Sequence, residues 1–546
     1  MIAPFETQKL RWPDSVGAIW SQILCETTLD VVIPLLQQDP DASALIFEDD
    51  VIVTRGALLD GVERFASHLR DRLRPGDRVI LAIGNRAEFF IAWLSILANR
   101  GVPVIISPDL GSYTAIHIAH DSGAVLAIAD GTAADVLRSV TAGSRQKLEV
   151  ISVAGEEPNG FDHLGVGVES FNLGGVNASI HEPAGIHYTS GTTGPPKGCV
   201  HDHRQYIRYA DIGMRLYPFA ASDRLLNTLQ FHYGDSVWLW IIALKLGADF
   251  VSVRKFSVSR FWPNVDRLGV TMFLGIGAIP NLLLTVPPSD LERGHKIRFA
   301  MQVGVPGAQH AELVERFGFP WVEGYGMSET GVTICMPLDS SNDYIGTGAI
   351  GIPVPEVDVT LHDDAGEKIE GPGIGQLSVR TPDMMLGYFN LPDATAEVLH
   401  DGWLRTGDLV RRDENDVYYF LGRTKLIIRR GGENVAPEEV EAVLRMHPSV
   451  VDAAVVPVAD ELRGEEIKAY VQLEDGASFE PQILSDFCAA HLSAFKVPRY
   501  FQQQTAAFPR TPSLRIQKSA LAIDGVHQVT SVWDGDESST RGVRTP

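Results

Sequence analysis

The sequence predicts an α/β protein with a large N-terminal domain of parallel-rich sheets flanked by helices and a small α+β domain near the C-terminus. Three observations lead to this prediction. Short β-rich runs alternate with helical runs from residue 45 to 135, hairpin-like strands follow residue 345, and a compact βα-rich stretch follows a glycine pair at residues 431–432. The chain has 546 residues, too many for one hydrophobic core, so we expect two to four domains.

The N-terminal part alternates strands and helices in the rhythm of a parallel sheet with crossovers. Val79–Ile83 is predicted to be a buried strand, and Ala87–Arg100 a helix that ends at Gly101. Val102–Ser107 and Ala124–Ala129 are the next predicted strands. The same rhythm resumes further along the chain, in Arg224–Leu229, Asp249–Val253 and Val270–Leu274.

Turn-rich segments dominate after residue 345. The turns HDDAGE and RRDEND separate short predicted strands, which is typical of hairpins. These strands are Val357–His362, Gly375–Arg380 and Val417–Leu421. The stretch after the glycine pair predicts a compact unit of two helices and two strands, namely Pro437–Met446, Val451–Val458, Glu466–Leu473 and Pro481–Leu492. We therefore expect domains at 1–425 and 426–525, and a disordered tail at 526–546, where the sequence is polar and lacks periodicity.

Charge and composition exclude some partners. With 46 basic and 69 acidic residues the formal charge is −23, a field that repels nucleic acid and anionic membranes. The N-terminus has no signal-peptide core, and apolar runs such as Phe89–Leu97 are shorter than the ~20 residues that span a bilayer. Four cysteines without CxxC spacing predict neither a disulfide framework nor a zinc site. We expect a cytoplasmic protein without stable membrane insertion.

The most informative segment is Tyr188–Cys199, YTSGTTGPPKGC. Glycines let consecutive N–H groups converge on an anion, hydroxyls add donors, and a lysine adds a positive charge. This pattern predicts a phosphate-binding loop between two strands, although a polar flexible hairpin is the alternative. It is not a Walker loop, because Pro196 precedes the lysine. The predicted phosphate-binding residues are Thr189, Ser190, Gly191, Thr192, Thr193, Gly194 and Lys197.

This segment resembles the phosphate-binding signature of the adenylate-forming superfamily, which comprises acyl-CoA synthetases, adenylation domains and beetle luciferases. Similar motifs follow in the family's order over about residues 40 to 525. The resemblance implies a ligase that uses ATP and Mg²⁺ to convert a carboxylic acid to its acyl-AMP, releasing pyrophosphate, and then transfers the acyl group to coenzyme A. It also implies a small β-barrel-like part in the N-terminal adenylation domain and a mobile C-terminal lid that rotates between the two half-reactions.

The motif GYGMSET at 324–330 resembles the family's adenine and magnesium motif. By that match the Tyr325–Gly326 turn binds the nucleotide, with Tyr325 stacked on adenine. Ser328 contacts the α-phosphate, and Glu329 is the catalytic carboxylate that holds Mg²⁺. An aromatic ring, a hydroxyl and a carboxylate within five residues also suit a base, a phosphate and a hard cation on chemical grounds.

Two further motifs resemble the ribose and thioester segments of the family. GWLRTGD at 402–408 implies that Asp408 accepts hydrogen bonds from both ribose hydroxyls, with Arg423 as its partner. RRGGENVAPEE at 429–439 implies that Gly431 and Gly432 line the narrow tunnel of the pantetheine arm. Taken singly, each of these could be an ordinary turn.

The sequence defines the acyl-binding site less clearly than it defines the nucleotide motifs. His232 matches a position where the family often has an aromatic residue or histidine beside the carboxylate and the acyl tunnel, and a structural histidine is the alternative. Tyr233, Trp238 and Gly275 are candidates for the acyl pocket, while Trp238 and Trp240 also suit a hydrophobic core. The histidine and tryptophans favour an aromatic or short polar acid over a long fatty chain.

The chain departs from the family pattern at the catalytic lysine, which normally follows a glycine near the C-terminus. In Pro509–Leu521, PRTPSLRIQKSAL, Leu514 and Arg515 occupy those two positions and Lys518 lies three residues further on. Either cation could stabilise the charge that develops on the α-phosphate, and we expect Lys518 rather than Arg515. The hinge position is also unusual, with Leu426 where the family usually has aspartate.

Two other functions stay open. The acceptor of the acyl group could be an amino acid, an amine or a carrier-protein thiol. This alternative is kept because Leu514 and Arg515 replace the usual glycine and lysine of the family. An inactive nucleotide-binding module is a second alternative, although the candidate ligands Lys197, Glu329 and Asp408 argue against it. The identity of the acid is not predicted, and neither is the oligomeric state, for which a homodimer stays open.

Overall fold

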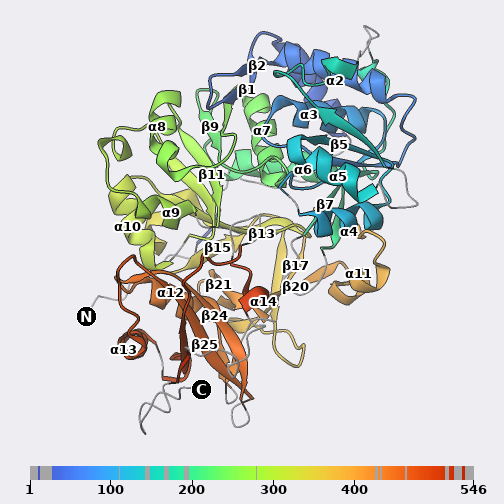
Figure 1. Ribbon diagram of the computed structural model, residues 1–546. Helices are drawn as coiled ribbons and strands as arrows, with labels where there is room; N and C mark the ends of the chain where they lie inside the picture. The colour runs from blue at the N-terminus through green and yellow to red at the C-terminus, as the bar shows by residue number, and fades with distance from the viewer. Residues whose placement is uncertain are drawn as a thin grey trace.

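The structure is a computed structural model. It describes residues 10–12, 27–109, 111–141, 148–164, 171–189, 196–277, 279–305, 307–424, 428–430, 433–460, 464–492, 494–510, 516–521 and 532–534. Three β-sheets organise the chain, and the α/β fold class predicted from the sequence is confirmed. In Figure 1 the sheets of the large N-terminal part occupy the upper two thirds of the view, and the C-terminal sheet lies below them in orange and red.

The seven-stranded sheet carries the loop predicted to bind phosphate. Its strand order is β18-β8-β7-β4-β3-β5-β6, in which β7, β4, β3, β5 and β6 are parallel. Crossover helices separate these parallel strands, as the alternating pattern predicts. The strands are β3 (Arg78–Ala82), β4 (Val102–Ile105), β5 (Leu126–Asp130), β6 (Glu149–Val153), β7 (Pro183–Tyr188), β8 (Gly198–Asp202) and β18 (Gly387–Tyr388).

The fourteen-stranded sheet has a parallel part and an antiparallel part. The order β1-β10-β9-β11-β12-β13 is parallel throughout. These strands are β1 (Ser43–Phe47), β9 (Arg224–Asn227), β10 (Asp249–Ser252), β11 (Met272–Ile276), β12 (Phe299–Val303) and β13 (Trp321–Met327), with β2 (Ile52–Thr54) antiparallel at the edge.

The hairpins expected after residue 345 are present, and they extend this sheet. Strand β13 pairs parallel with β12 on one side and antiparallel with β14 on the other, so no break separates the two parts. The antiparallel strands after β13 continue this path, and the barrel-like shape that the family resemblance implies for them stays a prediction. The antiparallel strands are β14 (Gly331–Cys335), β15 (Ala349–Pro353), β16 (Asp358–His362), β17 (Gly373–Arg380), β19 (Leu399–His400), β20 (Trp403–Arg412) and β21 (Tyr418–Arg423).

The third sheet is built from the C-terminal part. Its strands are β22 (Ile428–Arg430), β23 (Glu433–Val435), β24 (Val450–Asp460), β25 (Gly464–Leu473), β26 (Tyr500–Gln503) and β27 (Val532–Asp534). It has its own core, which includes Val440, Leu444, Val455 and Phe501. Strand β27 pairs with β26, so these three residues form a sheet edge inside the stretch expected as a tail. The domain boundary near residue 426 lies outside the described residues and stays a prediction.

Helices pack against both large sheets. Every residue of α3 is buried and α7 is almost wholly buried, which explains why the sequence of each is apolar on all sides. Phe90 of α3 and Trp240 of α7 pack with their rings 4.2 Å apart, which places Trp240 in the core. The helices are α1 (Thr28–Gln38), α2 (Arg55–Leu69), α3 (Ala87–Ala98), α4 (Ser112–Ser122), α5 (Gly131–Thr141), α6 (His203–Leu216), α7 (Gly234–Leu246), α8 (Val258–Leu268), α9 (Ile279–Thr285), α10 (Gly307–Phe317), α11 (Pro392–Val398), α12 (Pro437–Arg445), α13 (Pro481–His491) and α14 (Lys518–Leu521).

Two expectations from composition can be compared with the described part of the chain. None of the helices there combines the length and the apolar character that a membrane crossing requires. Cys199, Cys335 and Cys488 are buried free thiols, so no disulfide joins them.

Candidate active site

The predicted site residues gather at the carboxyl ends of parallel strands. Thr189 directly follows β7, His232 lies in the segment after β9, and Ser328 directly follows β13. In open α/β sheets this edge is where ligands bind, because the loops that leave the strands converge there. Figure 1 shows β7 and β13 near the middle of the molecule, above the C-terminal sheet.

The turn predicted to bind phosphate lies between two antiparallel strands. Strands β7 and β8 pair from Pro183–Asp202 to Tyr188–Gly198, and the Thr189 N–H donates to the Lys197 carbonyl oxygen at 2.9 Å. Both ends of the turn are therefore fixed by the sheet. Ser190, Gly191, Thr192, Thr193 and Gly194 lie outside the described residues, so their role stays a prediction.

Tyr388 connects the two motifs predicted to bind phosphate and Mg²⁺. Its hydroxyl donates to Oε1 of Glu329 at 2.8 Å, and the Nζ atom of Lys197 lies 4.9 Å from the centre of its ring. The Glu329 side chain is buried, so this hydrogen bond to a charged acceptor is stronger than an exposed one. One tyrosine thus contacts a cation through its ring and a carboxylate through its hydroxyl.

The backbone around Tyr388 reinforces this connection. The Met385 N–H donates to the Glu329 carbonyl at 2.8 Å, and the Phe389 N–H donates to the Gly198 carbonyl at 2.7 Å. Burial raises the pKa of the Tyr388 hydroxyl, and the nearby Glu329 carboxylate raises it further, so the tyrosine remains a donor. Sequence reasoning missed Tyr388. Its only local signal is a Gly-Tyr pair, and the pairing of β18 with β8 that brings it to the site is a long-range contact.

Asp408 and Arg423 form the expected pair. They face each other across β20 and β21, with Arg423 Nε 2.8 Å from Asp408 Oδ1. The hydroxyl of Tyr325 donates to Oδ2 of the same carboxylate at 2.5 Å. Asp408 is only 1% exposed, so the pair is held in a fixed position before any nucleotide binds.

The position of Tyr325 adds a role that the sequence does not predict. Its ring is 8% exposed and lies 6.2 Å from the ring of Phe420, which is itself 37% exposed. The hydroxyl is committed to Asp408, so Tyr325 orients the predicted ribose ligand as well as offering a ring face. Gly326 is required by space, because a Cβ there would lie 2.5 Å from the Gly331 carbonyl oxygen. Adenine stacking by Tyr325 stays a prediction.

Three histidines, of which His201 is buried and His187 and His232 are half-buried, interact around the phosphate hairpin. His187 of β7 hydrogen-bonds through Nε2 to the Tyr206 hydroxyl at 2.7 Å and interacts with the backbone of His232. The ring of His201 on β8 lies 5.5 Å from the ring of His187 and interacts with the backbone of Ser328. These contacts join the phosphate hairpin to both neighbouring motifs, and individual motifs in the sequence do not reveal them.

Burial decides the protonation of these histidines. It lowers the pKa of both His187 and His232 to about 4, so both rings are neutral at physiological pH. The Nδ1 atom of His232 is buried and accepts no hydrogen bond from the residues that the structure describes. His232 can therefore offer an uncharged polar atom to a ligand, which agrees with its predicted place beside the substrate.

Glu323 positions the loop after β12. Its carboxylate accepts hydrogen bonds from the Gly304 N–H at 2.7 Å and from the Val305 N–H. Burial raises the pKa of this carboxyl to about 8, although the two N–H donors oppose the shift. Glu323 lies two residues before Tyr325, so it fixes one loop of the site relative to the adenine motif.

Lys518, one of the two candidates for the catalytic cation, is engaged elsewhere. Its Nζ lies 2.7 Å from Glu441 and 3.4 Å from Glu438, both on α12. Burial lowers the pKa of the ammonium, but the two carboxylates outweigh it and the pKa is raised. Glu441 also accepts from the Val455 N–H at 2.7 Å, so Lys518 is part of the packing of the C-terminal sheet. Arg515, Gly431 and Gly432 lie outside the described residues.

The described residues can contribute one carboxylate to a magnesium ion. Nowhere in the described part of the chain do three His, Cys, Asp or Glu side chains gather in a metal-binding arrangement. Mg²⁺ commonly takes one or two protein carboxylates and completes its shell with water and substrate phosphates. Glu329, which lies near Lys197 and the end of the predicted phosphate turn, fits that mode of binding.

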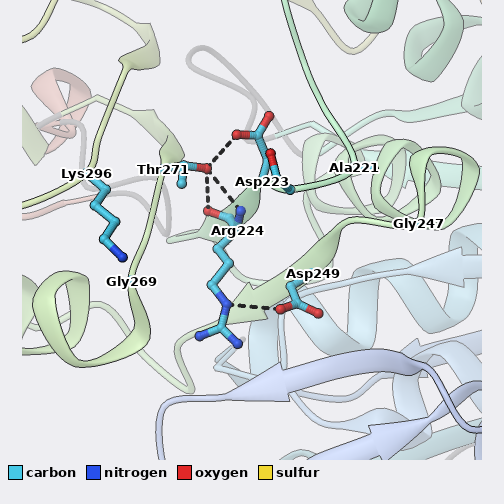
Figure 2. A pocket seen from close by; sticks show the side chains of 9 residues that line it. Ala221, Asp223, Arg224, Gly247, Asp249, Gly269, Thr271 and Lys296 are labelled. Carbon is cyan, nitrogen blue, oxygen red and sulfur yellow. Dashed lines mark hydrogen bonds and ion pairs between the residues drawn. The ribbon is translucent and has the colours of Figure 1, made fainter.

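An open pocket of about 540 Å³ lies at the opposite end of the parallel strands (Figure 2). It is lined by the first residues of β9 and β10, Arg224 and Asp249, and by Thr271 just before β11. Arg224 Nε is 2.9 Å from Asp249, and Thr271 donates to Asp223 at 2.8 Å. Arg224 with Asp249, and Thr271 with Asp223, are thus paired at this end of the strands, and the pocket is separate from the candidate site.

Comparison with known proteins assigns the family. The model of the AMP-binding enzyme family matches residues 35–389, and that of its C-terminal domain matches residues 439–514. Sulfoacetate–CoA ligase from Cupriavidus necator is 35% identical over 342 residues, which are 62% of this chain and 66% of that relative. Crotonobetaine/carnitine–CoA ligase from Escherichia fergusonii is 30% identical over 462 residues, 82% of this chain and 89% of that relative.

Solved structures agree with this result. o-Succinylbenzoate CoA synthetase from Bacillus subtilis, solved with its acyl-adenylate intermediate, superposes with a TM-score of 0.80 at 26% identity. The match covers 91% of this chain and 98% of that structure. The chain belongs to the AMP-binding enzymes, the adenylate-forming superfamily that its motifs resemble.

Proposed function

We propose that this protein is an AMP-forming acid–thiol ligase, which activates a carboxylic acid with ATP and passes the acyl group to coenzyme A. The observation that carries the proposal is the chain of contacts from Lys197 through Tyr388 to Glu329. In it, the cation next to the phosphate turn contacts the ring of Tyr388, and a carboxylate suited to Mg²⁺ accepts from the hydroxyl of the same residue. Asp408, which is buried and paired with the partly exposed Arg423, is the proposed ribose ligand.

In the first half-reaction the substrate carboxylate attacks the α-phosphorus of ATP and pyrophosphate leaves. The protein contributes positioning and positive charge rather than covalent chemistry. Lys197 and the turn from Thr189 hold the β- and γ-phosphates, and Ser328 contacts the α-phosphate. Glu329 would hold Mg²⁺, which would supply positive charge against the phosphates when bound. Asp408 and Arg423 fix the ribose, which orients the α-phosphorus toward the acid.

Arg515 is the better candidate for the cation that bridges the substrate carboxylate and the α-phosphate. Lys518 would have to leave two carboxylates in a largely buried site, and separating such a pair costs about 3–5 kcal/mol. Arg515 stands at the family's lysine position, keeps its charge at all physiological pH values, and offers a planar pair of donors. We therefore reverse the expectation from sequence and assign adenylation to Arg515.

In the second half-reaction the thiol of coenzyme A attacks the acyl carbon and AMP leaves. The C-terminal part turns so that Gly431 and Gly432 line the thiol's path, where a side chain would obstruct it. In the first half-reaction His232, as an uncharged ring, contacts the substrate carboxylate. The cytosol is the proposed compartment, since all three substrates are small soluble molecules.

The test is carboxylate-dependent exchange of labelled pyrophosphate into ATP, followed by mass analysis of products with coenzyme A. Exchange that requires an acid, together with an acyl-CoA product, is the expected result. Exchange without an acyl-CoA product, but with an amide when an amine or amino acid is supplied, would assign a different acceptor. Absence of exchange with a broad set of acids would contradict adenylation itself.

A further inference from the structure

We propose that Asn85 is a positioning residue for the acid: it holds the backbone of residues 229–231 and thereby fixes where His232 meets the substrate carboxylate. The inference rests on the proposed function, because it concerns the acid of the same reaction. It follows from the place of Asn85 in the fold, from the hydrogen bonds of its side chain, and from a second set of buried contacts on the same segment.

Asn85 connects the two large sheets. It lies in the loop between β3 and α3, and β3 is separated from β7 by one strand of the seven-stranded sheet. The segments that its side chain contacts follow β9 and β10 of the fourteen-stranded sheet. The predicted phosphate turn follows β7, and His232 follows β9. The contacts of Asn85 therefore join the sheet of the phosphate turn to the sheet that carries the acid-binding histidine.

The side-chain amide of Asn85 pairs with the segment before His232 as a neighbouring peptide group would. Its Nδ2 donates to the Leu229 carbonyl oxygen at 2.8 Å, and its Oδ1 accepts from the Phe231 N–H at 2.7 Å. Nδ2 also donates to the Val253 carbonyl oxygen at 2.7 Å. Asn85 is 4% exposed, so both donor hydrogens and the acceptor are used away from water. An amide bound in this way favours a single arrangement of the backbone that it contacts.

The main chain of Asn85 is itself fixed. Arg254 Nη1 donates to the Asn85 carbonyl oxygen at 2.9 Å, and the N–H of the preceding residue donates to Asp130 Oδ2 at 2.8 Å. Helix α3 begins two residues after Asn85, and the ring of its Phe90 lies 4.9 Å from the ring of Phe231. The amide therefore holds the segment from a rigid position.

Two further buried side chains hold the same segment. Asn227 Nδ2 donates to the Leu229 carbonyl oxygen at 2.8 Å, and Asn227 Oδ1 lies 3.0 Å from the Ser236 hydroxyl. That hydroxyl also lies 3.2 Å from the Gln230 carbonyl oxygen. Asn227 and Ser236 are both completely buried. Each of the three residues before His232 thus has a backbone group bonded to a buried side chain.

This network affects the first half-reaction through distance. The acid must lie at a set distance from the α-phosphorus, and a misplacement of about 1 Å can slow such a reaction by about 10²-fold. Asn85 itself does not contact the acid in this proposal. It acts through the backbone next to His232, so its loss should weaken the use of the acid and leave the use of ATP nearly unchanged.

A role in stability alone predicts a different result. Loss of the amide leaves the Phe231 N–H buried without its partner, so Asn85→Ala should melt at a lower temperature in either case. If stability were the only role, less protein would be folded, but the folded protein would keep its KM for the acid. A positioning role raises that KM, and it does so through His232.

The first measurement requires no substrate. Hydrogen exchange followed by mass spectrometry reports on peptides that contain residues 229–231, and in Asn85→Ala their amides should exchange about tenfold faster than in the wild-type protein. Asn99→Ala is the matched control, because Asn99 follows the other end of α3 and donates to the carbonyl oxygens of Ser95 and Ala66 at 2.9 and 3.0 Å. It should leave exchange in this segment unchanged. Unchanged exchange in Asn85→Ala would overturn the proposal.

The second measurement is pyrophosphate release with ATP and Mg²⁺. The probe is the acid with the highest kcat/KM in a panel of short aliphatic, dicarboxylic and aromatic acids, from acetate and malonate to benzoate. In Asn85→Ala, KM for this acid should rise about tenfold, and KM for ATP should stay within about twofold. In a His232→Ala background the same substitution should add little, because it acts through that residue. Equal rises in both KM values, or fully additive effects, overturn the proposal.

Ser236→Ala is a milder variant, and it decides the question if Asn85→Ala does not fold. It removes one hydroxyl from the network, so KM for the acid should rise about two- to threefold. Ser95→Ala is its control, since this buried serine of α3 donates to the Val62 carbonyl oxygen at 3.0 Å. With Asn85→Ala unfolded, an unchanged KM in Ser236→Ala overturns the proposal. If no acid of the panel releases pyrophosphate with the wild-type protein, the proposed function fails, and hydrogen exchange still decides whether Asn85 holds the segment.

Discussion

The nucleotide part of the site and the C-terminal part hold their charged residues in opposite ways. Around the nucleotide, Lys197, Glu329 and Asp408 are already oriented by the tyrosines Tyr388 and Tyr325. In the C-terminal part, Lys518 is neutralised by two glutamates of the same sheet and helix unit. One region is arranged to receive a ligand, whereas Lys518 of the other is used for packing.

This difference between the two regions indicates that they have different roles in the proposed reaction. A nucleotide site that is already ordered spends little free energy on ordering its side chains when ATP binds, because its donors and acceptors need no reorganisation. In the proposed mechanism the C-terminal part brings different groups to that site in each half-reaction. A cation held in packing contacts, as Lys518 is, would not be available for that task. Arg515 and Lys518 are therefore expected to have different roles, and variants of the two regions are expected to differ as follows, from the largest effect to the smallest.

The largest effect is expected for Arg515→Ala. Loss of a positive charge at the developing negative charge should slow adenylation by about 10²–10³-fold. The measurement is acid-dependent pyrophosphate exchange, with Arg515→Lys as the variant that should recover part of the rate. The thioester step, started from synthetic acyl-AMP and coenzyme A, should be nearly unaffected. Full adenylation by Arg515→Ala would contradict the assignment of Arg515 as the cation of the adenylation step.

Lys518→Ala is the matched comparison in the same segment. It leaves Glu441 buried without its cation, so the C-terminal sheet should be destabilised by about 3 kcal/mol or more. Exchange by the protein that remains folded should stay within a few-fold of wild type. If Lys518→Ala loses adenylation while Arg515→Ala keeps it, then the two roles are the reverse of those proposed.

Asp408→Asn comes next. The amide keeps the size of the side chain but removes the charge opposite Arg423, which weakens both that pair and the expected contact with ribose. We expect KM for ATP to rise by about 100-fold with a smaller change in KM for the acid, corresponding to roughly 3 kcal/mol. Equal changes in both constants would indicate a general loss of structure rather than a nucleotide ligand.

The sequence predicts the elements of this site better than their connections. Strand boundaries such as those of β3 and β9, and the Asp408–Arg423 pair, follow from periodicity and from motifs of known spacing. Tyr388 and His187 could not be found that way. Their roles depend on which strands become neighbours, and that is decided by packing across the whole sheet.

Lys518 illustrates the same limit from the other side. Its spacing from the expected lysine position is plausible for a catalytic residue, and only the contacts with α12 show that the ammonium is already occupied. A linear motif records that a cation is present in a segment, but it does not record which carboxylates lie opposite it.

Tyr388→Phe tests the connection that sequence reasoning missed. Removing the hydroxyl leaves Glu329 without a hydrogen bond worth about 1.5–3 kcal/mol, while the ring beside Lys197 remains. Affinity for ATP in the presence of Mg²⁺, measured by calorimetry, should fall by about tenfold, and affinity without Mg²⁺ should change less. Tyr419→Phe, which removes a hydroxyl bonded to Asp413 on the antiparallel strands, is the control. Equal losses with and without Mg²⁺ would contradict a link through Glu329.

The smallest effect concerns Glu323 and pH. The pKa of this buried carboxyl is about 8 in the folded protein and near 4.5 when exposed, so the folded state binds the extra proton between those values. Its contribution to stability is therefore fully present below about pH 4.5 and is lost as the pH rises through 8, at about 1 kcal/mol per pH unit. Glu323→Gln should melt with a shallower dependence on pH between 5.5 and 8 than wild type does. Because the amide keeps an acceptor for the Gly304 N–H, the loop after β12 should stay in place, and an unchanged slope would mean that Glu323 is ionised throughout.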